Sequence, residues 1–250
     1  SVKMVELSHV GKGNQLYRME RYVIESIPAE AVTEGNIVNM EVVSECLQRG
    51  WRRMGTRLKN VSLALPITDV ITKRINVPAG QREDDLVFQV ENEASQYIPF
   101  SLDEVDLDFQ VVGPTAENSD EVEVLIAASR KEKVEDRVAV ALSAGLKTLV
   151  MDIETYAAQS AFELALSQLP DGGKNQIIAL VDIGSTTIKM NVFYNSESVY
   201  TRDQPFGGNQ LTQEISNQFN LPLEEAELAK RNGNLPENYK TDVLQPFCET

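Results

Sequence analysis

The chain has 250 residues, which is enough for one or two domains with a sizeable buried core. Hydrophobic residues make up 42% and charged residues 24% of it, which is typical of a soluble globular protein and excludes a wholly disordered or fibrous chain. The formal net charge of -15 argues against nucleic acid as a partner, because a long phosphate backbone would be repelled over most of the surface. A mononucleotide is not excluded, since loop amides and helix N-termini hold phosphates locally.

Cysteine and histidine are too few for most metal or catalytic sites. Cys46 and Cys248 lie far apart, so we interpret both as structural thiols of a reducing compartment. His9 is the only histidine, which argues against a serine-protease triad. The sequence contains no apolar run long enough to span a membrane and opens on no secretory signal. Because residues 1–7 already have strand character, we expect further residues upstream.

The first segment predicts a β-hairpin followed by a helix and a buried strand. Residues 1–7 and 15–24 are rich in β-formers and flank the turn Gly11-Lys12-Gly13-Asn14. Residues 39–53 space their apolar side chains as one helical face, in which Trp51 is expected to be a core residue. The apolar run 61–65 ends at Pro66, where we expect a boundary.

The next segment predicts a compact inserted subdomain with the order strand, helix, strand, strand. The strands are expected at residues 70–77, 105–112 and 121–127, with a helix at 84–98. The apolar face of this helix is expected to consist of Leu86, Val90, Ala94, Tyr97 and Ile98.

The chain then returns to alternating helices and strands. Ser129 and Glu132 form the pattern of a capping box for a helix that ends near Gly145. The expected apolar face of this helix is Val134, Val138, Ala141 and Leu142. A strand at 147–153 and an alanine-rich helix reaching Leu169 follow.

The last segment opens with the continuous apolar run 177–181, which is typical of a strand covered on both faces. A second hairpin is expected from residues 188–194 and 199–202. Helices carrying Leu211, Ile215 and Phe219, and then residues 223–231, complete the chain.

The two hairpins indicate a concealed duplication. The sequence SVKM at residues 1–4 opens the first hairpin, and TIKM at residues 187–190 opens the second. The acidic, glycine-containing, hydroxyl-rich loop 182–186 precedes the second copy. Such loops suit a phosphate clamp, since glycine lets backbone amides approach phosphate, hydroxyls donate to it, and the acid orients a hydrated magnesium ion. The alternative is an ordinary hairpin connection.

Several segments in order resemble the PilM family of the actin-like superfamily, with the cell-division protein FtsA as a well-known relative. They are YIPF at 97–100, LDEV at 102–105, LDFQV at 107–111, ASRKE at 128–132, DIETYA at 152–157, FGGNQLT at 206–212 and EEAELAKR at 224–231. The resemblance implies a two-lobed actin-like α/β fold that is incomplete at both ends. Its first lobe would comprise residues 1–66 and 147–175, the inserted subdomain residues 67–146, and the second lobe residues 176–250.

The resemblance also implies a function. PilM proteins are ATP-binding scaffolds on the cytoplasmic side of the inner membrane that bind the N-terminal cytoplasmic peptide of PilN and link the type IV pilus platform to the pilus motors. Homo-oligomers are a further expectation. Three alternatives stay open: an FtsA-like filament protein, a sugar or glycerol kinase of the same superfold, and a platform that binds no nucleotide.

Site residues follow from the same resemblance. For ATP and Mg²⁺ these are Lys3, Asp182, Gly184, Ser185, Thr186, Thr187, Gly207, Gly208, Glu227 and Lys230, with Asp182 oriented toward the metal. Without the resemblance, Glu227 and Lys230 read as a solvated ion pair at i, i+3 spacing. An extended PilN peptide is expected in the groove between the inserted subdomain and the first lobe, at Tyr97, Ile98, Pro99 and Phe100, where core packing is the alternative for Tyr97 and Ile98.

One departure from the pattern bears on catalysis. Ser185 stands where actin has a second acid, so we expect slow or absent ATP hydrolysis. The acidic run at residues 103–108 lacks the glycine and terminal glutamate of a calcium loop, and we interpret it as a solvated strand face.

Overall fold

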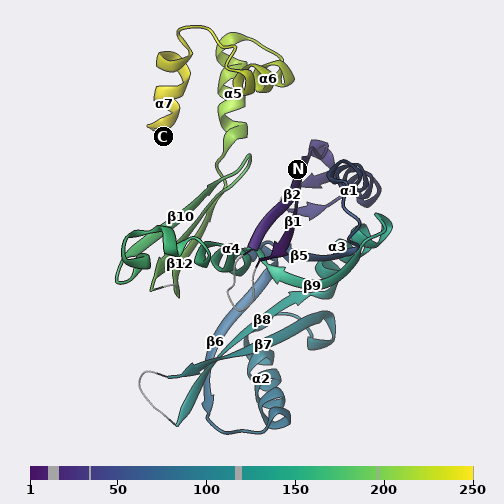
Figure 1. The fold of residues 1–250 in the computed structure, drawn as a ribbon, viewed down its shortest axis with the longest axis vertical. Helices are drawn as coiled ribbons and strands as arrows, with labels where there is room; N and C mark the ends of the chain where they lie inside the picture. Colours follow the sequence, from purple (N-terminus) through teal and green to yellow (C-terminus); the bar gives the residue numbers. More distant parts are fainter. Residues whose placement is uncertain (11–16, 34, 116–119, 196, 250) are drawn as a thin grey trace. The chain divides into compact units, whose positions relative to one another are not determined.

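The computed structural model describes residues 1–250 except 11–16, 34, 116–119, 196 and 250. The chain forms two compact units, Ser1–Leu164 and Ala165–Thr250, and each is described by itself (Figure 1). The expected turn at Gly11-Lys12-Gly13-Asn14 lies outside the described residues.

Unit 1 opens with the predicted hairpin and helix. Strands β1 (Val2–His9) and β2 (Tyr17–Glu25) pair antiparallel, and helix α1 (Met40–Met54) follows. Asn39 caps α1 through its side-chain oxygen, which accepts a hydrogen bond from the Val42 amide, and Gly55 ends the helix in the left-handed conformation at φ 67°. Between β2 and α1 lie η1 (Ala29–Ala31) and the short strands β3 (Val32–Thr33) and β4 (Asn36–Ile37).

The core of this part joins α1 to a parallel strand pair and a second helix. Strand β5 (Asn60–Leu65) pairs with β9 (Lys147–Ile153), and α3 (Lys131–Ser143) packs beside α1. Val43 and Leu47 of α1 contact Val140 and Ala141 of α3, and Trp51 packs against this cluster as expected. Helix α3, which lies within the expected inserted subdomain of residues 67–146, also contributes to this core.

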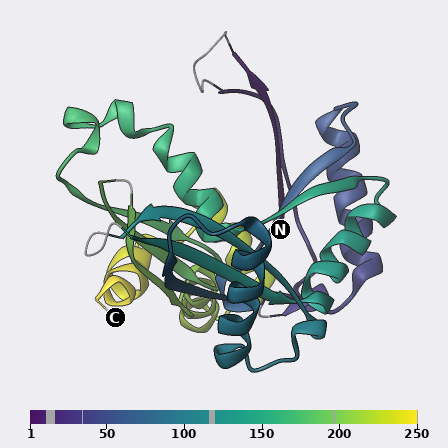
Figure 2. The same cartoon turned by 90° about the horizontal axis from the view of Figure 1, so that it is seen from below.

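The inserted segment has the predicted order strand, helix, strand, strand. It consists of η2 (Ile67–Asp69), β6 (Val70–Pro78), α2 (Glu83–Tyr97), η3 (Leu102–Glu104), β7 (Val105–Pro114) and β8 (Glu121–Arg130). The sheet order is β6-β8-β7, which leaves β7 at an edge. Helix α2 covers one face of this sheet (Figures 1 and 2), where Val90 packs against Val77, Val124 and Ile126.

Three predictions for the middle of the chain are wrong in detail. Ser129 forms no capping box: it lies in β8, where its hydroxyl donates to the Asp69 carbonyl oxygen at 2.9 Å. Leu142 is 69% exposed, and Val140 takes its place in the core. Helix α4 (Glu154–Glu163) is shorter than the expected helix that continues to Leu169. The separate turn η4 (Leu166–Gln168) follows it.

Unit 2 contains a three-stranded antiparallel sheet followed by helices. After η5 (Pro170–Gly173) come β10 (Ile177–Ile183), β11 (Ile188–Tyr194) and β12 (Glu197–Gln204), in the order β10-β11-β12. The helical elements are α5 (Gly208–Phe219), α6 (Leu223–Asn232), η6 (Lys240–Leu244) and α7 (Gln245–Cys248). Alternate β10 side chains, including Ile177 and Val181, remain exposed, so the expected cover on both faces is absent from the described residues.

The two hairpins share more than their opening residues. In the first, the strand register shifts between Glu6 and Leu7; in the second, it shifts between Val192 and Phe193. Both bulges stand at the same offset from the matching lysines, Lys3 and Lys189. A bulge at an equivalent position is a specific structural feature, and it supports the duplication inferred from four residues.

Both cysteines are free thiols, Cys46 buried and Cys248 exposed. Within the described part of the chain, no helix is long and apolar enough to cross a membrane.

Candidate functional site

The acidic loop of unit 2 joins β10 to β11 as a tight turn. Ile183 pairs with Ile188, and the Gly184 amide donates to the Thr187 carbonyl oxygen at 3.0 Å. Asp182 lies at the end of β10 with an exposed side chain. The hydroxyls of Thr186 and Thr187 are 3.5 Å apart. The turn therefore presents a carboxylate and several hydroxyl groups together.

This loop also caps helix α5. The Gly208 amide donates to the Gly184 carbonyl oxygen at 3.0 Å, and the Asn209 amide donates to that of Ser185 at 2.8 Å. The Gly207 amide donates to Gln210 Oε1 at 2.8 Å. The amides of all three predicted glycines are thus engaged within the protein. The expected contact from glycine amides to phosphate is not available in this arrangement, and the hydroxyls and Asp182 remain as candidate ligands.

Only glycine fits at position 207, because the carbonyl groups of the loop after β10 lie very close to its backbone. A Cβ atom at Gly207 would lie 2.6 Å from the Gly184 carbonyl oxygen and 2.8 Å from the carbonyl group of Ser185. At Gly208 the nearest atom to an added Cβ is Lys230 Nζ at 3.6 Å, which is ordinary contact. The glycine pair therefore contains one residue that must be glycine and one that need not be.

Glu227 and Lys230 form one network with the start of α5. Glu227 Oε2 lies 2.6 Å from Lys230 Nζ and accepts a hydrogen bond from Thr212 Oγ1 at 2.6 Å. Lys230 Nζ also donates to the Gly208 carbonyl oxygen at 2.9 Å. Arg231 Nε is 2.7 Å from Glu227 Oε1. The ion pair expected from the i, i+3 spacing is thus present, and it connects α6 to the loop-bound end of α5.

Glu227 is held in its ionised form. Burial raises the pKa of this carboxyl, but the hydrogen bonds from Lys230, Thr212 and Arg231 outweigh burial and lower the pKa to about 2. Glu227 is therefore a permanent negative charge at neutral pH.

The structure brings together residues that the sequence analysis did not select. Thr212 completes the Glu227 network, and its position one helical turn after Gly208 was the available signal. Lys189 stands opposite Asp182 in the register of β10 and β11, and opposite Asp203 in β12. Its equivalence to Lys3 in the repeated motif could have identified it. Lys3 itself lies in β1 of unit 1, with an exposed side chain opposite Ile24.

The described residues of unit 2 suit a hydrated magnesium ion rather than a metal held by protein ligands alone. Among the described residues, no group of three or more His, Cys, Asp and Glu side chains could hold a metal. Mg²⁺ commonly binds through one or two carboxylates, keeps several waters and takes its other ligands from nucleotide phosphates. A single exposed Asp182 beside hydroxyl groups fits that mode.

The four residues expected to bind a peptide divide between core and surface. Ile98 is 5% exposed and packs with Ala94 and Val105, so its side chain belongs to the core. Tyr97 is half-buried, and burial together with the nearby Glu93 raises its pKa. Pro99 and Phe100 remain at the surface, where the Arg130 guanidinium lies 5.3 Å from the centre of the Phe100 ring.

Unit 1 also contains a groove that these four residues do not line. It has a volume of about 360 Å³, and its walls come from β7 and β8 of the inserted sheet and from the end of β9 with the start of α4. Leu125, Met151 and Tyr156 provide apolar lining. The charged side chains among its described lining residues are all acidic: Asp106, Asp108 and Asp152.

Two of the groove acids, Asp108 and Asp152, each accept a hydrogen bond from the backbone amide of the next residue. Asp108 Oδ1 accepts a hydrogen bond from the Phe109 amide at 2.8 Å, and Asp152 Oδ1 accepts one from the Ile153 amide at 2.7 Å. The second oxygen of each of these two carboxylates has no hydrogen-bond partner among the described residues and is left for a ligand. β7 is an edge strand, and its outward backbone groups can pair with an added strand. The groove is thus suited to an extended, basic and partly apolar peptide.

Comparison with known proteins assigns the family. The family model described as "Type IV pilus assembly protein PilM" matches residues 1–250, the whole of this sequence. The chain belongs to the PilM family. In the solved "PilM-PilN type IV pilus biogenesis complex", one chain is 26% identical with a TM-score of 0.75, covering 99% of the present chain and 71% of its own length.

Two further matches are less similar to this chain. Cell division protein FtsA of Bacillus subtilis (strain 168) is 24% identical over 230 residues, which are 83% of this PilM chain and 51% of FtsA. The PilM chain thus spans about half the length of that relative. Ethanolamine utilization protein EutJ from Carboxydothermus hydrogenoformans is 18% identical with a TM-score of 0.44, covering 80% of the PilM chain and 49% of EutJ. The α/β actin-like fold predicted from the sequence is confirmed.

Proposed function

We propose that this PilM chain is part of an ATP-binding scaffold of the type IV pilus assembly platform, located on the cytoplasmic side of the inner membrane, whose first unit captures the N-terminal peptide of a PilN protein. The acidic groove of unit 1 carries this proposal. Family membership and the likeness to a PilM solved together with PilN support it. The same scaffold would connect the platform to the pilus motors.

The chemistry of the groove defines the peptide. Apolar side chains would pack against Leu125, Met151 and Tyr156, and a basic side chain would meet Asp106 and Asp108. Main-chain bonds to the edge of β7 would give affinity, while alternate side-chain positions would give specificity. Binding on the order of micromolar, or about -8 kcal/mol, is the scale for such a contact.

A titration of a synthetic PilN N-terminal peptide tests this site. The double variant Asp106→Asn and Asp108→Asn should bind at least about tenfold more weakly, because charge-assisted contacts are lost. The matched control is Asp84→Asn with Asp85→Asn, which changes two exposed acids at the start of α2 outside the groove lining. Equal binding by the groove variant and the parent would move the peptide site elsewhere, first to the pocket beside Phe100 and Arg130.

The nucleotide part of the proposal rests on the loop that precedes β11. Asp182 would orient the waters of a magnesium ion, and Ser185, Thr186 and Thr187 would donate to phosphate oxygens. The family resemblance adds Lys3 as a residue that would neutralise phosphate charge, and Glu227 and Lys230 as residues that would lie toward the ribose. Because Ser185 cannot act as an ionised water-orienting group, nucleotide would act mainly as a conformational ligand with slow turnover.

Calorimetry with ATP and magnesium on the full-length protein tests this assignment. Asp182→Ala should abolish binding, whereas Glu197→Ala, an exposed acid at the far end of the same sheet, should leave it unchanged. Equal ATP binding by Asp182→Ala and the parent would refute the site. Rapid steady-state phosphate release that depends on Asp182 would refute slow turnover.

A further inference from the structure

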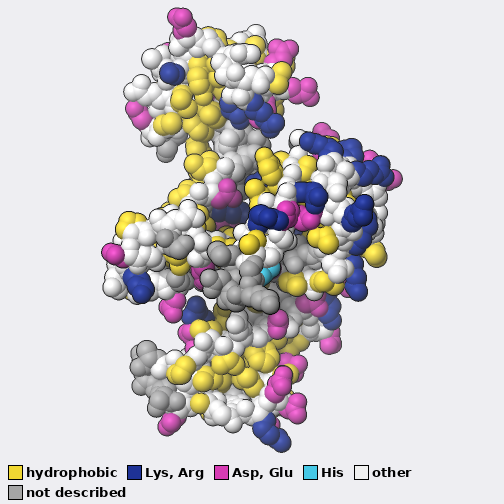
Figure 3. Space-filling view, in the orientation of Figure 1, with side chains coloured by type: hydrophobic (Ala, Val, Ile, Leu, Met, Phe, Trp, Pro, Cys, Tyr) yellow, Lys and Arg dark blue, Asp and Glu magenta, His cyan; other side chains and the backbone are white. Residues whose placement is uncertain are grey.

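One part of unit 1 has a charge opposite to that of the whole molecule. Every charged residue between positions 49 and 59 is basic, in a chain with 38 acidic and 23 basic residues. Figure 3 shows Lys and Arg side chains gathered over the part of unit 1 that contains α1. The fold adds Lys147 of β9, whose amide donates to the Lys59 carbonyl oxygen at 2.7 Å.

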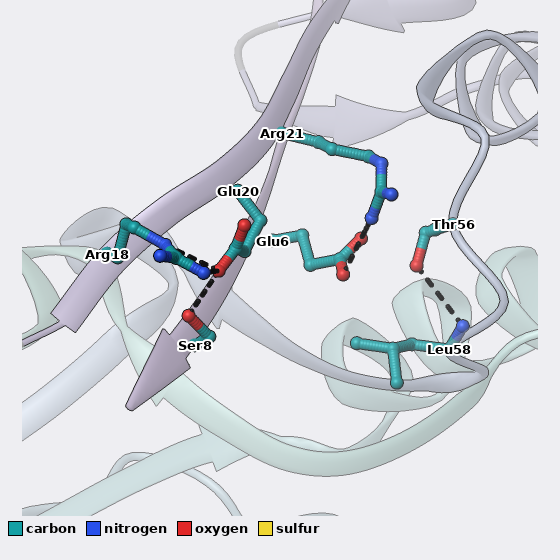
Figure 4. Close-up of polar contacts among 7 residues, drawn as sticks. All are labelled: Glu6, Ser8, Arg18, Glu20, Arg21, Thr56 and Leu58. Atoms are coloured by element: carbon teal, nitrogen blue, oxygen red, sulfur yellow. Dashed lines mark hydrogen bonds and ion pairs between the residues drawn. The ribbon is translucent and has the colours of Figure 1, made fainter. Parts of the chain in front are cut away.

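Some of the nearby cations are neutralised and others are not. Glu25 pairs with Arg49 and Arg53, at 3.1 and 2.6 Å. Arg18 pairs with Glu20, and Arg21 pairs with Glu6 at 2.9 Å (Figure 4). Four further cations form no ion pair with the described residues and have exposed side chains. We call them the basic patch: Arg52, Arg57, Lys59 and Lys147.

An exposed aliphatic side chain lies among these cations in the sequence. Leu58 is 54% exposed and stands between Arg57 and Lys59. Its amide donates to Thr56 Oγ1 at 3.2 Å, which fixes the turn after α1 (Figure 4). Thr56 also donates to Glu6, and this bond, with those from Arg21, lowers the pKa of Glu6. The turn is therefore held in place by the β1–β2 hairpin.

We propose that the basic patch with Leu58 is a docking surface for anionic phospholipid headgroups. A bilayer surface offers many phosphates to several separated cations at once, and its interfacial region accepts an apolar side chain among them. An acidic protein is the competing occupant, and the vesicle assay distinguishes it because a surface specific for a protein would show no preference for phosphatidylglycerol. This inference is independent of the peptide groove and of the nucleotide loop.

Two competing explanations cover only part of the evidence. Basic residues near a helix C-terminus complement the helix dipole, which accounts for Arg52 and Arg53. It does not account for Arg57, Lys59 and Lys147, which lie outside α1. The net charge of -15 opposes approach to an anionic membrane at long range, but screening limits this to about 10 Å at 0.1 M salt, so the local charge decides.

Vesicle flotation with this chain tests the proposal. Vesicles of phosphatidylcholine with about one third phosphatidylglycerol should bind it, and pure phosphatidylcholine vesicles should not; high salt should release it. Each basic residue near the surface contributes roughly fivefold, so the triple variant Arg52→Glu, Arg57→Glu and Lys59→Glu should bind more than about 100-fold more weakly. Leu58→Ala should weaken binding severalfold without changing the charge.

A matched triple variant controls for net charge. Lys174→Glu, Arg202→Glu and Lys240→Glu changes three exposed cations of unit 2 by the same total charge and should retain binding. Circular dichroism and the fluorescence of Trp51, the only tryptophan, verify that each variant is folded. The proposal is overturned if phosphatidylglycerol gives no gain over phosphatidylcholine, or if both triple variants lose binding equally.

Discussion

Gly207 and Gly208 are neighbours in the chain but tolerate a side chain very differently. The difference comes from the loop that follows β10, whose carbonyl groups approach Gly207 more closely than any real Cβ would allow. The sequence shows two equivalent letters, and only the packed structure tells them apart. We predicted both as residues of the nucleotide site, and the structure shows the Gly208 amide bonded to the Gly184 carbonyl oxygen and the Gly207 amide bonded to Gln210 Oε1.

Gly207→Ala should destabilise unit 2 by about 1–3 kcal/mol because the added methyl group forces the loop away from α5. Gly208→Ala should change stability by less than about 1 kcal/mol, and alanine's higher helix propensity offsets any crowding. Hydrogen exchange of the α5 amides, which the loop carbonyls protect, measures both. Equal protection in the two variants would contradict the steric argument.

Glu227 should make stability depend on pH in the acid range. Its pKa of about 2 is below that of an unfolded glutamate, so the stabilisation is complete above about pH 4.5 and is lost as the pH falls toward 2. Because the side chain is 31% exposed, screening reduces the effect to roughly 1–2 kcal/mol.

Thermal unfolding of Glu227→Gln and of the parent between pH 2 and 7 measures this contribution. The variant should be less stable near neutral pH, and the difference should shrink toward pH 2. The exposed Glu237→Gln, which lies outside the helices of unit 2, should match the parent throughout. A constant difference across the whole pH range would show that the charge of Glu227 is not responsible.

At the scale of elements, helix α2 carries apolar side chains on both its buried and its exposed face. Val90 is fully buried against β6 and β8, while Phe88 is 67% exposed. Both are apolar residues of similar helix propensity. Their positions on the helix, rather than their hydrophobicity, decide their contribution to stability.

Val90→Ala should destabilise the inserted segment by about 2 kcal/mol, since it leaves a cavity in the cluster of Val77, Val124 and Ile126. Phe88→Ala should change stability by less than about 0.5 kcal/mol. Hydrogen exchange of β6 and β8 reports on this segment separately from the remainder of unit 1. A larger loss of protection in Phe88→Ala would mean that Phe88 is covered in solution.

The packing of α3 decides where a deletion of the inserted segment should end. A deletion of residues 67–146 would take away α3, whose Val140 and Ala141 belong to the core formed with α1. A deletion that ends at Arg130 leaves that core intact.

At the scale of the whole molecule, the acidic surface should steer a basic peptide. The net charge of -15 and the three groove acids act in the same direction on a cation. Association of a PilN peptide with a basic residue should slow by about tenfold between 0.05 and 0.5 M salt. Stopped-flow measurements test this, with a peptide whose basic residue is replaced by glutamine as the control. An equal salt dependence for both peptides would place the effect outside the groove.

The sequence by itself determined the order of the main strands and helices and the family. The apolar spacing in α2 predicted its buried face, with Val90 and Ala94 at 0% exposure, because the period of an amphipathic helix is written into neighbouring residues. The pilus family followed from short segments spread along the chain, and the match over residues 1–250 confirms it.

Only the tertiary structure decided the contacts between residues that lie far apart in the chain. Ser129 matched a capping box, but its hydroxyl bonds to the Asp69 carbonyl oxygen because β8 runs beside the end of η2. The groove acids Asp108 and Asp152 come from different parts of unit 1, and Lys147 joins Lys59 only through the pairing of β5 with β9. Local propensity acts over a few residues, whereas grooves and charged patches arise from chain reversals that place distant segments together, so no local pattern encodes them.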